Sequence, residues 1–82
     1  MAQAEIHEEE FMAVEVTAPM VGKIIQVLVE VGQQVSEDEP VLILEAMKVE
    51  MPVVAPQNGK VSVINVKEGQ TVEGDSVLME LE

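Results

Sequence analysis

An internal repeat is the feature that most constrains how this chain can fold. Sliding the sequence by 37 positions aligns residues 18–45 with residues 55–82 without a gap, and eleven of the twenty-eight pairs are identical. The identical pairs are Ala18/Ala55, Pro19/Pro56, Gly22/Gly59, Lys23/Lys60, Val29/Val66, Gly32/Gly69, Gln33/Gln70, Val35/Val72, Asp38/Asp75, Leu44/Leu81 and Glu45/Glu82. Shared β composition alone would not align the glycines, so we interpret the repeat as two copies of one half-domain.

Each copy is too small to bury its own apolar face, so the two halves are expected to pack on each other with pseudo-two-fold symmetry. Positions that are apolar in both copies predict the core. These are Ile24/Val61, Val27/Ile64, Val29/Val66, Val35/Val72, Leu42/Met79 and Leu44/Leu81. Simple alternation places residues 27 and 29 on one face but not residue 24, which predicts a bulge near residues 25–26 and 62–63.

Short runs rich in Val and Ile, separated by Gly, Pro, Asp and Asn, predict an all-β domain over residues 13–82. The expected strands are 14–16, 23–29, 41–45, 49–54, 60–66 and 77–81. Six or more short strands in so short a chain favour a small sandwich or barrel. Residues 1–12 are acidic and lack apolar periodicity, so they are predicted to be a disordered tail in which His7 is simply exposed.

Composition excludes several kinds of function. The chain has four lysines, no arginine, sixteen acidic residues and a net charge of −12, which disfavours binding to nucleic acids or anionic membrane surfaces. It has no cysteine and one histidine, so neither a His/Cys metal site nor a Ser-His-Asp triad is expected. The sequence shows no signal-peptide pattern and no apolar stretch of membrane-spanning length, and a cytoplasmic location is therefore expected.

The segment between the copies, residues 46–54, is expected to have no counterpart elsewhere in the chain. The flanking strands leave about three residues in which to turn, which predicts a hairpin with Lys48 at or beside its tip. Ala46, Met47 and Lys48 favour helices, whereas tight hairpins favour Asn-Gly. A turn built from residues that do not favour turning is expected at a functional site. Spacing alone leaves open whether Lys48 has a special role or is an ordinary solvated lysine.

The motif Glu45-Ala46-Met47-Lys48, at the junction of a duplicated β domain, resembles the biotinyl domains of biotin-dependent carboxylases, decarboxylases and transcarboxylases. Those domains share with lipoyl domains a flattened eight-stranded barrel of two four-stranded sheets. The resemblance implies that Lys48, on a hairpin tip, receives biotin. It also implies that Glu45, Ala46, Met47 and Val49 contribute to recognition by the biotin ligase.

The resemblance covers roughly residues 14–82, with two departures from the family pattern. The family usually has Met after the modified lysine, and Val49 at that position implies slower or altered modification. The ungapped repeat leaves no room for the protruding thumb of some bacterial carriers. Lipoyl domains usually carry Asp-Lys-Ala at the tip, which Met47 and Val49 do not fit, so the motif favours biotin over lipoate.

The resemblance implies a non-catalytic biotin carrier, whose biotinyl-lysine swings a carboxylate between active sites. The implied partners are a biotin protein ligase, and biotin carboxylase with carboxyltransferase or decarboxylase subunits. Two alternatives stay open at this point. One is a lipoyl carrier with the same fold, and the other is an unmodified barrel that serves only as an interaction module.

Overall fold

The computed structural model describes residues 13–82, and these residues form eight β-strands and no helix. The strands are β1 (Val14–Thr17), β2 (Gly22–Val27), β3 (Gln34–Val35), β4 (Pro40–Ala46), β5 (Val49–Val54), β6 (Gly59–Ile64), β7 (Thr71–Val72) and β8 (Val77–Leu81). The predicted tail at residues 1–12, which includes His7, lies outside the described residues. Over the described range, no helix is present that could cross a membrane.

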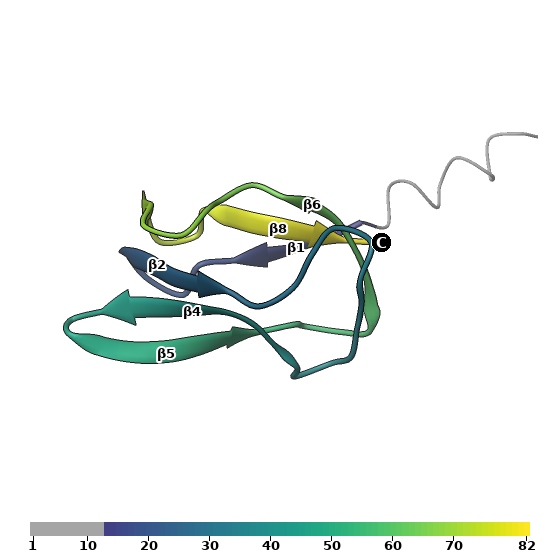
Figure 1. Cartoon of the computed structure of the whole chain (residues 1–82), viewed down its shortest axis with the longest axis horizontal. Coiled ribbons are helices and arrows are strands. Elements are labelled where there is room, and N and C mark those ends of the chain that lie inside the picture. Colours follow the sequence, from purple (N-terminus) through teal and green to yellow (C-terminus); the bar gives the residue numbers. More distant parts are fainter. Residues whose placement is uncertain (1–12) are drawn as a thin grey trace, which may run out of the picture.

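The strands form two four-stranded sheets, in the orders β1-β8-β6-β3 and β5-β4-β2-β7 (Figure 1). All neighbouring strands are antiparallel. In the repeat, β1, β2, β3 and β4 correspond to β5, β6, β7 and β8. With this correspondence, the strand order of one sheet becomes the strand order of the other. Each sheet takes strands from both halves. The predicted all-β fold with pseudo-two-fold symmetry is therefore confirmed.

The structural repeat begins earlier than the alignment indicates. Residues 51–54 of β5 occupy the place of β1 in the other sheet and show the same burial pattern, with Val53 and Val16 both buried. The prediction that residues 46–54 have no counterpart was therefore wrong for the last four of them. Val16/Val53 is the one identical pair in this stretch, because the exposed positions carry unrelated residues.

The predicted bulges are present in both halves. The register of β2 on β4 shifts between Ile24 and Gln26, and the register of β6 on β8 shifts between Val61 and Val63. The extra residue in each strand changes which residues of the alternation face the core. Ile24 and Val61 can therefore be fully buried, although they do not alternate in step with the residues after the bulge. This explains why simple alternation does not describe the two strands.

A second pair of bulges was not predicted. The register of β4 on β5 shifts between Pro40 and Leu42, and β8 shows the equivalent shift on β1, around Leu78. As a result two consecutive residues, Val41 and Leu42, are both fully buried, as are Leu78 and Met79. Bulges of this kind bend the strand, and here they close the two sheets over one core.

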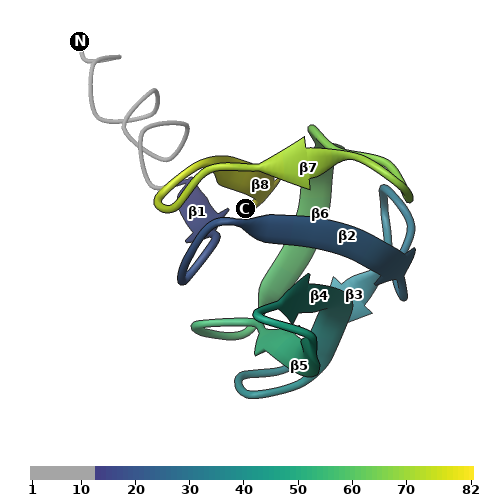
Figure 2. The ribbon, with the colours of Figure 1, turned by 90° about the vertical axis from the view of Figure 1, so that its left-hand side faces the viewer.

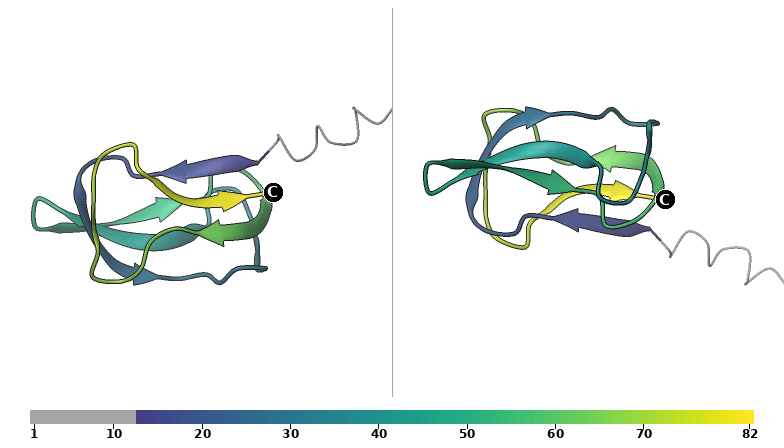
Figure 3. Two further views of the ribbon diagram at one scale, coloured as in Figure 1. Left: turned by 90° about the horizontal axis from the view of Figure 1, so that it is seen from above. Right: turned by 90° about the horizontal axis from the view of Figure 1, so that it is seen from below.

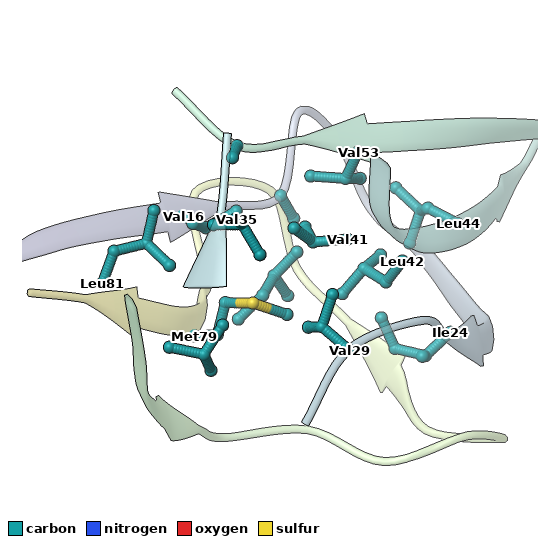
Figure 4. Packing of buried hydrophobic residues seen from close by; sticks show 14 of the residues in the cluster. Val16, Ile24, Val29, Val35, Val41, Leu42, Leu44, Val53, Met79 and Leu81 are labelled. Carbon is teal, nitrogen blue, oxygen red and sulfur yellow. The ribbon is translucent and has the colours of Figure 1, made fainter. Parts of the chain in front are cut away.

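The core is one continuous layer of aliphatic side chains between the two sheets (Figure 4). Figure 4 shows Val16 and Leu81 at one end of the layer, Ile24 and Leu44 at the other, and Met79 in the middle. Nine of the twelve positions predicted as core are fully buried; the other three, Val27, Ile64 and Val66, are half-buried and pack against it. Across residues 13–82 no polar or charged residue is buried.

Two strands end earlier than predicted, and the other predicted strand boundaries agree with the structure to within one residue. β2 and β6 end at Val27 and Ile64, two residues before the predicted ends, because the chain then crosses to the other sheet. The crossings lead through Gly32 and Gly69, whose φ angles of 94° and 93° suit glycine, into the two-residue strands β3 and β7. These two strands were not predicted, since two residues are too short for any periodicity.

Candidate functional site

The β4–β5 hairpin projects from one end of the barrel, away from the end that carries the C-terminus (Figures 1 and 3). Ala46 of β4 pairs with Val49 of β5, so the turn consists of Met47 and Lys48 alone. The predicted hairpin is confirmed, with a turn one residue shorter than expected. Lys48 therefore lies at the apex of the most protruding hairpin in the described part of the chain.

The backbone of this turn is left-handed at both positions. Met47 has a φ of 54° and Lys48 a φ of 68°, as a type I′ hairpin turn requires. Each such angle costs a residue with a side chain about 1–2 kcal/mol. Within residues 13–82, the other positive φ angles belong to two pairs of repeat mates, Gly32/Gly69 and Asp38/Asp75. Glycine and aspartate are residue types that tolerate a positive φ. The turn is thus strained where Asn-Gly would be relaxed.

Replacing Met47 by glycine should raise the free energy of unfolding by about 0.5–1 kcal/mol, because glycine relieves the left-handed strain and this outweighs its entropy loss. Urea denaturation of the purified chain measures the change. Val49→Gly is the matched control: it removes a side chain from the neighbouring strand position, where no positive φ is present, and should be destabilising. A Met47→Gly variant that is less stable than wild type would contradict strain at the turn.

The predicted recognition residues are placed differently around the tip. Met47 is 87% exposed and Val49 is 57% exposed, whereas Ala46 is only 4% exposed. Glu45 is half-buried in the next residue pair down the hairpin, opposite Glu50. Met47 and Val49 are accessible to another protein, but the Ala46 side chain faces inward and cannot be contacted while the hairpin is closed. Ala46 therefore packs at the base of the turn, and its role in recognition by the ligase stays a prediction.

Two neighbours at the base of the hairpin were not singled out from the sequence. Lys23 in β2 lies in register with Glu45, which in turn lies opposite Glu50 in β5. Two carboxylates directly opposite each other are unfavourable, and Lys23 is the cationic residue in register beside them on the neighbouring strand. The repeat mates Lys60 and Glu82 are joined by two backbone hydrogen bonds of 2.9 and 2.8 Å. The signal in the sequence was the conserved Lys/Glu spacing in both copies.

Gly22 lets β2 approach the hairpin closely. A Cβ atom at Gly22 would lie 2.6 Å from the Glu45 carbonyl oxygen and 3.0 Å from Leu44 Cγ. The region has no enclosed cavity, since residues 13–82 contain no pocket. They also contain no cluster of three or more His, Cys, Asp or Glu side chains able to hold a metal ion. The structure therefore presents a primary amine on a projecting turn, and a free amine can form an amide with a carboxylic acid cofactor.

Comparison with known proteins agrees with this geometry. Residues 14–81 match the model of the biotin/lipoyl attachment family, described as "Biotin-requiring enzyme". A biotin carboxyl carrier protein of Streptococcus mutans is 60% identical over 37 residues, which is 45% of this chain and 28% of that protein. The mitochondrial pyruvate carboxylase of Mus musculus is 37% identical over 68 residues, which is 83% of this chain and 6% of that protein.

A solved structure shows the same fold. The urea carboxylase of Kluyveromyces lactis superposes with a TM-score of 0.81 at 33% identity, over 85% of this chain and 6% of that one. The chain spans 28% and 50% of the length of two carrier proteins that it matches, from Streptococcus mutans and Solanum lycopersicum. The match of the family model to most of the chain, together with the fold and the projecting lysine, shows that this chain belongs to the biotin/lipoyl attachment family as a biotinyl domain with biotin as its cofactor.

Proposed function

We propose that this chain is a non-catalytic carrier in which biotin is joined through an amide bond to Nζ of Lys48. The observation that supports this most directly is the position of Lys48 at the apex of the strained, projecting turn. The other three lysines lie elsewhere: Lys23 in β2, Lys60 in β6 and Lys67 in the loop that follows β6. None of these three is on a turn between paired strands.

The chain would contribute attachment and presentation, while the chemistry belongs to partner proteins. The deprotonated amine of Lys48 attacks the carbonyl carbon of adenylated biotin, an amide bond forms, the amine loses a proton and AMP leaves. A ligase must activate the acyl group and remove the proton, because the described residues offer no pocket in which to do so. Val49 in place of the family's usual Met is expected to slow or alter this step.

After attachment, biotin supplies a ureido nitrogen that can hold a carboxyl group. The hairpin holds the Cα atom of Lys48 in place through its pairing with the barrel, and leaves the side chain free in solvent. Because the arm is tethered, each encounter with a nearby active site becomes effectively intramolecular. A rigid base and a free end are what such a carrier requires.

The proposed partners are a biotin protein ligase, and the biotin carboxylase and carboxyltransferase or decarboxylase components of a biotin-dependent enzyme. The similar proteins named as carboxylases support this assignment. The acidic composition keeps the carrier soluble and favours partner surfaces that are basic. A cytoplasmic location stays a prediction.

Co-expression with a biotin ligase tests the proposal. Intact mass spectrometry should show one biotinyl group per chain, and the band should bind streptavidin on a blot. A parallel expression with a lipoate ligase and lipoate should leave the mass unchanged. A chain that stays unmodified while a known carrier is loaded in the same cells would refute the biotin carrier and favour the interaction module, and lipoate on Lys48 would favour the lipoyl carrier.

A further inference from the structure

The repeat allows the outer faces of the two sheets to be compared position by position, because outward-facing strand residues have mates in the other sheet. Ile43 is half-buried between Leu42 and Leu44, which are fully buried, so its side chain faces outward. Its mate Glu80 lies in the same setting in β8, between two fully buried residues. Each such pair shows which side chains the fold accepts at one outward position.

The outer face of the β5-β4-β2-β7 sheet is apolar at positions where the outer face of the other sheet is polar. Five outward-facing residues in or directly after β2, β4 and β5 are apolar and have polar or charged mates. The pairs are Ile25/Ser62, Leu28/Asn65, Ile43/Glu80, Pro52/Glu15 and Val54/Thr17. One pair, Gln26/Val63, is reversed. The fold accepts polar residues at all five positions, so folding alone does not require the apolar ones.

The five apolar residues lie side by side on the outside of the barrel. Their strands β5, β4 and β2 are neighbours in one sheet (Figure 2). Ile43 in the middle strand is in register with Pro52 on one side and with Gln26, which follows Ile25 in the bulge of β2, on the other. We name this surface the sheet patch and define it as Ile25, Leu28, Ile43, Pro52 and Val54.

The sheet patch continues to the end of the sheet that lies away from Lys48. Val54 is in register with Pro40 at the start of β4. On the other side of β4, the Leu28 amide donates a hydrogen bond of 2.9 Å to the Val41 carbonyl oxygen. Leu28 is 40% exposed and Val54 39%. Since residues 13–82 form no pocket, this surface suits a protein partner better than a small molecule, which needs a concave site.

Carboxylates border the sheet patch at both ends. Toward the hairpin tip, Glu50 and Glu45 are the next outward-facing residues of β5 and β4, and Lys23 adds one positive charge beside them. At the other end, the exposed Glu39 directly precedes β4. An apolar surface between carboxylates is complementary to a partner surface that is apolar at its centre and carries lysine or arginine around it.

Two occupants from the chain itself fit this charge pattern poorly. A second copy carries the same net charge of −12 and would be repelled. Residues 1–12 contain four glutamates and no lysine or arginine, so they lack the positive charge that the border of the patch attracts. The charge pattern therefore favours a different protein with a basic contact surface.

Resting on the proposed function, we infer that the sheet patch is the surface by which the loaded carrier docks on its biotin carboxylase component. The ligase has to reach the unmodified amine at the tip itself, whereas an enzyme that receives the finished arm can hold the barrel by its side. β4 and β5 form both the patch and the hairpin, so docking there also fixes the direction in which Lys48 projects. Ile43, at the centre of the patch, lies about 10 Å along β4 from Ala46, where the turn begins.

The test exchanges two patch residues for those of their own repeat mates, as Leu28→Asn/Val54→Thr, which leaves the net charge unchanged. The biotin-loaded carrier is assayed with the purified biotin carboxylase component of the same organism, ATP and bicarbonate. The KM for the carrier should rise about five- to tenfold while kcat changes less than twofold, as for loss of an apolar interface contact. Added salt should raise the KM of the wild type, because the charges at the border are complementary.

The matched control is Val63→Gln on the outer face of the other sheet. Val63 is 40% exposed, as Leu28 is, and it also receives the residue of its repeat mate. This variant should keep the KM of the wild type with the carboxylase component. The KM for the ligase should be unchanged in both variants, because the hairpin tip is intact. Circular dichroism and thermal unfolding verify folding, and the single variants Leu28→Asn and Val54→Thr replace the double variant if it does not fold.

Three outcomes would overturn the inference. One is an unchanged KM for the carboxylase component in the patch variant, and another is an equal rise in Val63→Gln. The third is a KM that rises only with the carboxyltransferase component, or a wild-type dimer in sedimentation velocity that the patch variant abolishes, since the patch would then serve a different occupant. Failure of the proposed function is distinguishable, because wild-type protein would then take up no biotin from the ligase and no loaded carrier could be prepared.

Discussion

Replacing Lys48 by arginine is expected to abolish biotin loading completely. A guanidinium group keeps the positive charge and most of the length of the side chain, but it stays protonated and does not attack the activated acyl group. The turn conformation should persist, since neither residue type favours a positive φ over the other. Intact mass after co-expression with a biotin ligase should equal the unmodified mass, and the streptavidin blot should be blank.

The chain contains its own matched control for this experiment. It has four lysines and no arginine, so Lys23→Arg/Lys60→Arg/Lys67→Arg leaves Lys48 as the sole lysine. This triple variant should be loaded to the same extent as wild type. Biotin on the Lys48→Arg variant, or loss of biotin from the triple variant, would show that the attachment site lies elsewhere.

Replacing Gly22 by alanine should lower the free energy of unfolding by about 2–3 kcal/mol, as overpacking in a tight site does. The added methyl group would lie 2.6 Å from the Glu45 carbonyl oxygen, which belongs to the backbone at the base of the hairpin and cannot rotate away. A domain of this size is stabilised by only about 5–10 kcal/mol, so the loss would be a large fraction of the total. Thermal unfolding should shift by about 4–8 °C for each kcal/mol.

Gly59 is the repeat mate of Gly22 and supplies the control. A Cβ atom at Gly59 would lie 3.2 Å from both the Glu82 carbonyl oxygen and Leu81 Cβ, a contact that small shifts can relieve. Gly59→Ala should therefore lower the free energy of unfolding by less than about 1 kcal/mol. Equal losses in the two variants, measured by urea denaturation, would contradict a special close approach at Gly22.

Comparing the two copies in the sequence predicted most of the fold. Pairs such as Leu44/Leu81 identified the core because a position that is apolar twice has to be buried twice. The misfit of Ile24 with alternation predicted the bulge that the structure shows. The start of the repeat at β1 and β5 was missed because those strands lie at sheet edges, where exposed positions vary freely and Val16/Val53 alone repeats.

Other features had weaker signals or none. The bulge at Val41 could have been suspected, since Val41 and Leu42 are adjacent apolar residues and Leu78 and Met79 repeat them. The burial of Ala46 also follows from two-residue alternation along β4, in phase with Leu44. The left-handed turn could not be predicted from residue preference, because Met and Lys do not favour it. It forms because the pairing of β4 with β5 leaves only two residues to connect the strands.

The exchange of strands between the two sheets has a consequence for the order of events during synthesis. β1 pairs with β8, so Val14 and Leu81, from the two ends of the described range, meet in one sheet. Pairings between residues so far apart in sequence form late in folding, and each sheet needs strands from the second half of the chain. On a ribosome, the β5-β4-β2-β7 sheet cannot be completed until residue 72 has emerged, and the β1-β8-β6-β3 sheet cannot be completed until residue 81 has emerged. Lys48 is translated well before that, so the ligase meets the fully built barrel only once synthesis has passed the last strand.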